Sequence, residues 1–217
     1  MKLDQLASPE TCSLNTLLPY PSHTDGQTEK ADRQMTTDAT VKAFKREASV
    51  EMSTWYKGIL ISNLATEQDT GGAFEFVVTR MKKGTEPPPH MHEREHEMFY
   101  VLEGMIDVYV GDECFRAAAG ECAFLPKGKA HAFKIQSSEV HMLVLMTPGG
   151  FMNASASMAI PAQSLDIPPD DGITYTTVDL HETIKVFAKY GVRFLAPDEI
   201  ALELSSFPLC PTELRTK

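Results

Sequence analysis

Short apolar runs separated by turn residues fill the middle of the chain. From about residue 55 onward, β-branched and aromatic residues cluster at 56–61, 73–81, 98–103, 105–110, 123–125, 132–135 and 140–147. Glycines stand between most of these runs, and short strands with regular turn signals are typical of β-sandwiches and barrels. The pattern predicts an all-β fold built as a jelly-roll barrel.

The pattern changes on both sides of this region. Residues 1–45 carry short polar clusters and three prolines, which favour irregular structure and predict an N-terminal arm. Residues 153–171 are rich in Ser, Ala, Asp and Pro and are interpreted as a connector. We therefore expect an arm at 1–45, a barrel at 46–152, and a connector with a short C-terminal helical segment at 153–217.

Helical spacing is found only in the C-terminal segment. Residues 179–190 place four apolar side chains on one face, namely Leu180, Ile184, Phe187 and Ala188. Asp179 is a candidate N-cap and Gly191 a candidate C-terminal stop. A second short helix is expected after Pro197.

Composition and charge narrow the function classes. The 217 residues include 20 Lys and Arg against 30 Asp and Glu, a net charge of −10, which argues against a nucleic-acid partner. Apolar runs fall far short of the roughly 20 residues of a membrane span. The first ten residues lack the apolar stretch of a secretory signal, so a cytoplasmic location is expected. The four cysteines form no Cys-x-x-Cys pair, so neither disulfides nor a thiolate metal site is indicated.

Candidate chemistry begins in the stretch 84–104. His90 and His92 are two residues apart, and on a strand this spacing puts both imidazoles on the same face. Three prolines, at 87–89, precede them and make a stiff lead-in. The pair is therefore positioned to bind one metal ion.

The third ligand has two candidates. Glu97 lies five residues after His92, so a turn through 93–95 must bring its carboxylate back toward the imidazoles. His96 is the alternative, one residue earlier. A carboxylate lowers the charge on a bound dication, and this favours Glu97.

A second stretch, 120–131, ends in His131 after a glycine turn. On the strand that follows, alternation places Phe133 and Ile135 on the face of His131, and places Lys134 on the other. Three imidazoles and a carboxylate suit a divalent first-row metal with positions left open for substrate or O₂.

These two stretches resemble the two motifs of the cupin superfamily. The first motif, Gly-x5-His-x-His-x3,4-Glu-x6-Gly, is met by Gly84, His90, His92, Glu97 and Gly104. The second, Gly-x5-Pro-x-Gly-x2-His-x3-Asn, is met by Gly120, Pro126, Gly128 and His131, while Ile135 stands where Asn is usual. Nine matching positions in two spaced motifs are far more specific than one short pattern.

The resemblance covers about 100 residues and is closest to small single-domain cupins of the quercetin 2,3-dioxygenase-like group. It implies a jelly-roll barrel with one divalent metal inside, held by His90, His92, Glu97 and His131, and it implies a homodimer. The metal could be Fe, Mn, Ni, Cu, Co or Zn, since this donor set suits all of them.

The leading functional hypothesis is a metal-dependent dioxygenase acting on a phenolic, enolic or polyketide-like small molecule with O₂. By analogy with quercetinases, Glu97 would both ligate the ion and accept the substrate proton. Phe99, Phe133 and Ile135 share faces with the ligands and are candidate substrate-binding residues. The alternatives are a Lewis-acid isomerase, cyclase or decarboxylase with the same ligands, and a small-molecule-binding cupin without catalysis.

Overall fold

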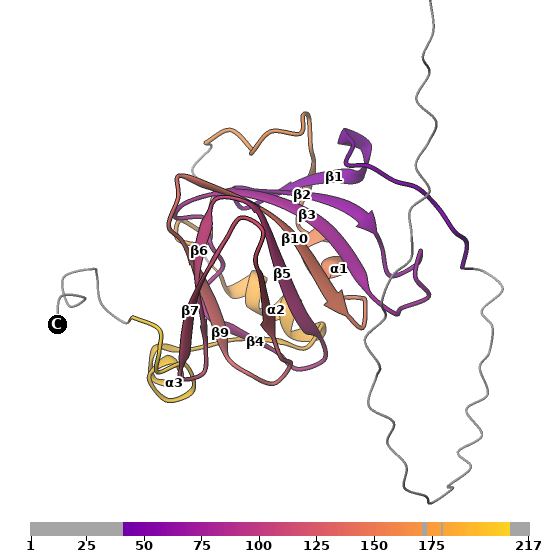
Figure 1. The fold of residues 1–217 in the computed structure, drawn as a ribbon. Coiled ribbons are helices and arrows are strands. Elements are labelled where there is room, and N and C mark those ends of the chain that lie inside the picture. The colour runs from indigo at the N-terminus through magenta and orange to yellow at the C-terminus, as the bar shows by residue number, and fades with distance from the viewer. Residues whose placement is uncertain (1–40, 171–172, 179, 209–217) are drawn as a thin grey trace, which may run out of the picture. The chain divides into compact units, whose positions relative to one another are not determined.

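The computed structural model describes residues 41–170, 173–178 and 180–208. Strands make up most of the regular secondary structure in this part of the chain, which confirms the all-β class (Figure 1). The strands are β1 (Ser53–Tyr56), β2 (Ile59–Ala65), β3 (Glu75–Lys82), β4 (His90–His92), β5 (His96–Glu103), β6 (Met105–Val110), β7 (Glu113–Ala118), β8 (Cys122–Leu125), β9 (His131–Ile135), β10 (Glu139–Thr147), β11 (Ile160–Pro161) and β12 (Val192–Phe194). Expectations for residues 1–40 and for a cap at Asp179 lie outside the described residues.

Two antiparallel sheets form the barrel. One runs in the order β11-β1-β2-β3-β10-β5-β8 and the other in the order β12-β4-β9-β6-β7. Successive strands such as β4 and β5, or β8 and β9, lie in different sheets, and crossings of this kind are typical of a jelly roll. Figure 1 shows β5 and β10 of the first sheet facing β6, β9 and β4 of the second. The jelly-roll prediction is confirmed.

The core lies between the sheets. Along β3, β5 and β10 every second residue is buried, as the period of a half-buried strand requires. Their inward side chains meet those of β6 and β9, and the most deeply buried members are Val77, Val101, Ile106, Val108, Ile135, Met142 and Met146. The barrel interior is thus filled mainly by aliphatic side chains.

Two strand predictions need correction. The run at 56–61 is a hairpin, because Lys57 and Gly58 both adopt positive φ and form the two-residue turn between β1 and β2. Strand β7 was not predicted at all. Its first four residues are exposed at the edge of the second sheet, and charged residues interrupt the apolar ones, so no apolar run marks it.

The C-terminal segment contains α1 (Met152–Ala156), α2 (His181–Lys189) and α3 (Pro197–Glu203), and a short 3-10 helix, η1 (Val50–Met52), precedes β1. Helices α2 and α3 match the predicted pair, and α2 ends just before Gly191 as expected. The predicted apolar face of α2 is only partly right. Thr183 and Phe187 form the buried face of the helix, whereas Ile184 is exposed. The helix is therefore rotated so that the small Thr183 side chain, and not Ile184, faces the core.

The segment 153–171 is not a plain connector. It starts within α1 and includes β11, which pairs with β1 at the edge of the first sheet. Further on, β12 pairs with β4 in the second sheet, with Val192 opposite His92 and Phe194 opposite His90. The segment after residue 152 therefore adds strands to both sheets, and the expected domain boundaries at 45 and 152 stay a prediction.

A smaller core lies on the outer side of the second sheet. Tyr109, Ala130 and Ala132 are buried there, together with Leu195 and Leu204 from the C-terminal segment. Ala132 faces away from the ligand side of β9, and α3 and its flanks cover it. This second core holds the C-terminal segment against the ligand-bearing sheet.

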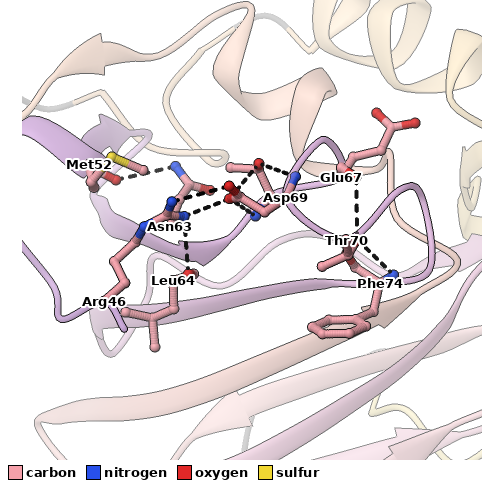
Figure 2. Close-up of polar contacts among 9 residues, drawn as sticks. Arg46, Met52, Asn63, Leu64, Glu67, Asp69, Thr70 and Phe74 are labelled. Atoms are coloured by element: carbon pink, nitrogen blue, oxygen red, sulfur yellow. Dashed lines mark hydrogen bonds and ion pairs between the residues drawn. The ribbon is translucent and has the colours of Figure 1, made fainter. Parts of the chain in front are cut away.

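The segment before β1 is fastened to the turn between β2 and β3 (Figure 2). Arg46 donates from Nη1 to Asp69 Oδ2 at 2.6 Å and from Nη2 to Oδ1 at 3.1 Å. Asp69 also accepts hydrogen bonds from the backbone and hydroxyl of Thr66. The Arg46 guanidinium and then Thr66 hold the pKa of the Asp69 carboxyl well below its usual range, so the pair is charged at neutral pH.

No helix among the described residues has both the length and the apolar character needed to cross a membrane.

Candidate metal centre

Four donor side chains converge inside the barrel. His90 and His92 come from β4, Glu97 from the start of β5, and His131 from the start of β9. One donor atom from each lies within 4.8 Å of all the others, and all four residues are buried. His90 and His131 are direct cross-strand partners, with ring centroids 4.5 Å apart. The turn between β4 and β5 returns Glu97 to the imidazoles, as the sequence predicted.

Backbone carbonyls orient two of the imidazoles. His90 Nδ1 lies 2.8 Å from the Pro88 carbonyl oxygen, and His131 Nδ1 lies 3.0 Å from that of Lys129. A carbonyl oxygen only accepts, so each Nδ1 carries the proton and the Nε2 lone pair of the neutral ring is free. This is the usual way in which a metal-binding histidine is held.

The third imidazole has a carboxylate neighbour instead. His92 Nδ1 lies 3.5 Å from Glu95 Oε2, within ion-pair range but longer than a good hydrogen bond. Both residues are buried, and neither atom has a hydrogen-bond partner. Glu95 follows His92 by three residues in the turn between β4 and β5, where the sequence suggested only a polar turn.

The donor set fits a divalent metal. His92 Nε2, His131 Nε2 and Glu97 Oε2 are buried without hydrogen-bond partners, although unpaired buried polar atoms are costly. Glu97 Oε2 lies 3.4 Å from His131 Nε2 and 3.8 Å from His92 Nε2. Burial, followed by the nearby His131 and His92, lowers the pKa of His90 well below its usual value, which keeps that ring neutral. Neutral imidazoles beside one carboxylate suit a first-row dication.

The alternative third ligand points elsewhere. His96 accepts a hydrogen bond from the Lys127 backbone N–H at 3.2 Å and stacks on Phe124, outside the cluster of four. His141, on β10, alternates with the buried residues of that strand and lies on the outer side of the sheet. Strand alternation thus sorts the histidines between the interior and the outer face.

A cavity opens beside the four donors. It has an empty volume of about 670 Å³ including its mouth, and His90 and Glu97 lie in its wall. The rest of the lining is mainly apolar and aromatic, which is common for small-molecule sites. Phe99 and Phe133 line it and contact each other edge to face at 5.4 Å, whereas Ile135 is fully buried in the core and is not among the lining residues.

An aromatic wall links the centre to the C-terminal segment. Phe151 contacts the His92 ring at 4.6 Å, and Phe194 lies 5.8 Å from the His90 ring. Phe187 of α2 contacts both phenylalanines, at 5.7 and 5.5 Å. Sequence reasoning missed this wall because the three rings lie far from the motifs along the chain. The core-facing helical position of Phe187 was the one available signal.

Comparisons with known proteins find a matching family model and distant relatives. Residues 77–148 match the family model described as Cupin domain. Quercetin 2,3-dioxygenase of Bacillus subtilis (strain 168) is 26% identical over 106 residues, which cover 49% of this chain and 32% of that protein. Quercetin 2,3-dioxygenase of Aspergillus japonicus is 29% identical over 68 residues, covering 29% of this chain and 19% of that protein. The matches thus span about a third and a fifth of the two relatives.

Solved structures to which the chain shows similarity include KdgF from Halomonas sp., with a TM-score of 0.39 and 22% identity, covering 43% of this chain and 81% of that protein. Another is Pac13 of Streptomyces, described as a nucleoside dehydratase. It has a TM-score of 0.42 and 17% identity and covers 51% of this chain and 88% of that protein.

Proposed function

Because this chain carries a cupin domain with four buried donors beside an apolar cavity, we propose that it is a metal-dependent dioxygenase. The substrate class is a phenolic, enolic or polyketide-like small molecule. The observation that carries the proposal is the cluster of unpaired Nε2 and carboxylate atoms next to that cavity, in whose wall His90 and Glu97 lie. The two quercetin 2,3-dioxygenase relatives support the choice of reaction.

The four donor residues would bind the metal ion. His90, His92 and His131 would hold the ion through Nε2, and Glu97 would hold it through its carboxylate. A bound dication supplies positive charge that lowers the pKa of a substrate hydroxyl and, for a redox-active metal, a path for electrons to O₂. With three neutral imidazoles and one carboxylate the site carries a charge of about +1, which favours a phenolate or enolate.

Glu97 is the candidate proton acceptor. Its Oε2 atom is buried and unpaired, and the residue lines the cavity, so a substrate hydroxyl in the cavity can reach a carboxylate oxygen. Phe99 and Phe133 would pack against substrate rings and exclude water. The same donors would also suit a Lewis-acid isomerase, cyclase or decarboxylase. Such an enzyme would not need O₂, and this distinguishes the second function from the first.

We also propose a homodimer, formed through the outer face of the first sheet. Outward positions on four neighbouring strands bring together seven partly exposed apolar side chains, namely Phe76, Val78, Met98, Tyr100, Phe124, Leu143 and Leu145. A contiguous apolar face of this kind is uncommon on monomers and marks an association surface. A second copy of the chain can cover it with the same face.

The test combines metal analysis with oxygen uptake. We expect about one divalent ion per chain and O₂ consumption with flavonols when the protein is loaded with its preferred metal. His131→Ala should lower the metal content by at least about tenfold, because one of four ligands is lost. His141→Ala, on the outer face, is the matched control and should retain the metal. Substrate turnover that continues without O₂ would overturn the dioxygenase in favour of the Lewis-acid enzyme.

A further inference from the structure

Two hydroxyl groups in the cavity wall have no partner. Tyr56 is 4% exposed and Thr79 is 5% exposed, and both line the cavity. Neither Tyr56 Oη nor Thr79 Oγ1 makes a hydrogen bond. A buried hydroxyl without a partner is costly, so its presence in an otherwise apolar wall needs a reason.

Thr79 lies away from the metal-binding donors, and Tyr56, on β1 beyond β2, lies farther across the same sheet. Thr79 is opposite Met142 on β10, whereas Glu97 is opposite Met146 of the same strand. Four residues along β10 and two strand spacings across it separate the backbones of Thr79 and Glu97 by about 16 Å. Both side chains belong to the inward, buried set of their strands. The cavity therefore has polar groups at two separated places.

Aromatic rings fill the wall between these places. The Tyr56 ring stacks on Phe187 at 6.3 Å, and Phe187 contacts Phe151, which contacts His92. Tyr175 meets Tyr56 edge to face at 5.8 Å and also lines the cavity. A planar, ring-bearing ligand that reached from the metal-binding donors to the two hydroxyls would therefore contact apolar side chains along its length.

The Tyr56 phenol is a hydrogen-bond donor at neutral pH. Burial raises its pKa to about 12, and this outweighs the opposing hydrogen-bonding influence of the neighbouring Tyr175 and Thr183 hydroxyls, neither of which forms a well-aligned hydrogen bond with it. Thr79 carries a hydroxyl that both donates and accepts. The two groups can thus satisfy a phenol or carbonyl oxygen, whereas they would disfavour an apolar group left against them.

We propose that Tyr56 and Thr79 form a polar anchor for the far end of an elongated, ring-bearing ligand whose other end faces His90 and Glu97. The ligand class is a planar polyphenol or polyketide with one oxygen function at each end. This inference rests on the proposed function for the metal-facing end, while the anchor itself rests on the two unpaired hydroxyls.

A matched pair of ligands tests the anchor. The probes are flavonol and its analogue with one additional hydroxyl, para on the pendant phenyl ring. Binding of each is measured by titration calorimetry on the full chain loaded with Zn²⁺, without O₂. We expect the hydroxylated probe to bind about three- to tenfold more tightly, the gain of one or two neutral hydrogen bonds. The double variant Tyr56→Phe, Thr79→Val should bring the ratio of the two dissociation constants to about one.

Tyr100→Phe, which removes a phenol on the outer sheet face, is the control and should keep the wild-type ratio. Equal affinities of the wild type for both probes, or an unchanged ratio in the double variant, would overturn the anchor while leaving the dioxygenase intact. Conversely, a ratio that behaves as expected without O₂ uptake on any metal would overturn only the dioxygenase. If neither probe binds, both proposals fail.

The melting temperature of the ligand-free protein distinguishes an anchor from a structural hydroxyl. Since both groups lack partners, Tyr56→Phe and Thr79→Val should each melt within about 2 °C of the wild type or above it. A fall of more than about 4 °C in either variant would show that the hydroxyl stabilises the fold through a hydrogen bond, for example between Tyr56 and Tyr175, and would overturn the anchor.

Discussion

The Nδ1 atom of each imidazole at the centre faces an oxygen atom, but the neighbours differ. His90 and His131 face backbone carbonyls, which no side-chain substitution removes. His92 faces the Glu95 carboxylate at 3.5 Å. A carboxylate in this position aligns the ring and makes its Nε2 a better donor. The contact of His92 with Glu95 is thus the one that a single side-chain substitution can remove.

Glu95→Ala should weaken metal binding by about 10- to 100-fold, the usual effect of losing a residue that orients a ligand. Glu95→Gln, which can still accept a hydrogen bond, should recover part of the affinity. The measurement is a competition titration against a chelator of known affinity. Glu93→Gln, two residues earlier and exposed, is the control and should bind like the wild type. Equal affinity in Glu95→Ala and the control would contradict a positioning role.

Strand alternation explains what could be predicted at this scale. The charge of a carboxylate, together with a turn through 93–95, pointed to Glu97 as the third donor, and His96 does lie on the outer side beside Phe124. Tyr56 and Thr79 gave no signal, because a hydroxyl in an apolar run shows neither its depth nor whether it has a partner. Glu95 was interpreted as part of a polar turn, because a glutamate in a charged stretch gives no sign that its side chain is buried beside His92.

The elements depend on a few sharp corners, and the corner between β5 and β6 is the tightest. Gly104 adopts φ +88 there, and a side chain on it would meet the backbone oxygen of Glu139. Gly120 adopts φ +90 between β7 and β8 with nothing within 4 Å of the corresponding position. The two glycines share a backbone conformation and differ only in their surroundings.

We expect Gly120→Ala to cost about 1–2 kcal/mol, the strain of an L-residue at this φ. Gly104→Ala should cost a further 1–3 kcal/mol or so, because the backbone of β10 must move. Chemical denaturation of both variants measures the difference in free energy of unfolding. Equal losses in the two variants would show that the backbone oxygen of Glu139 yields easily to the added methyl group.

Elements with a clear apolar pattern were predicted well, and the others were not. Strand β6 was predicted with its observed bounds, and α2 to within two residues at its start. Strand β7 was missed because it is an exposed edge, and β12 because three residues carry no period of their own. Strand β12 exists because β4 offers it a partner, which a pattern along the chain does not reveal.

Within the described residues, the apolar side chains on the outer face of the first sheet stay partly exposed. Phe124 is the most exposed aromatic side chain of that face, at 51%, and it pairs across the strands with Met98. In a dimer built on a two-fold axis each substitution is present on both sides of the contact. A charge placed on this face is therefore present on both sides of the contact.

We expect the wild type to sediment as a dimer and Phe124→Glu to weaken the dimer at least about tenfold, since like charges would be buried at the contact. Leu202→Glu, on α3 and 84% exposed away from this face, is the control and should remain dimeric. Sedimentation velocity over a range of concentrations gives the result, with melting curves to show that both variants fold. A wild type that is monomeric throughout would contradict the proposed dimer.

At this scale the sequence indicated the barrel and the ligands but not how the C-terminal segment completes the pocket. The motifs cover the central strands only. Phe187 and Phe194 enter the wall through tertiary packing, and no local pattern records it. The net charge of −10 argued against a nucleic-acid partner and carried no information about the interior.

The pairing of β12 with β4 also sets the order in which the pocket can be assembled during synthesis. Val192 is opposite His92, so the two partners leave the ribosome about 100 residues apart. Strands β1 to β10 can pair before β12 exists, and in that interval the outer edge of β4 and the ring of His90 have no cover from Phe194. The metal-binding donors are thus made early, and Phe187 and Phe194, which complete the aromatic wall, are made later.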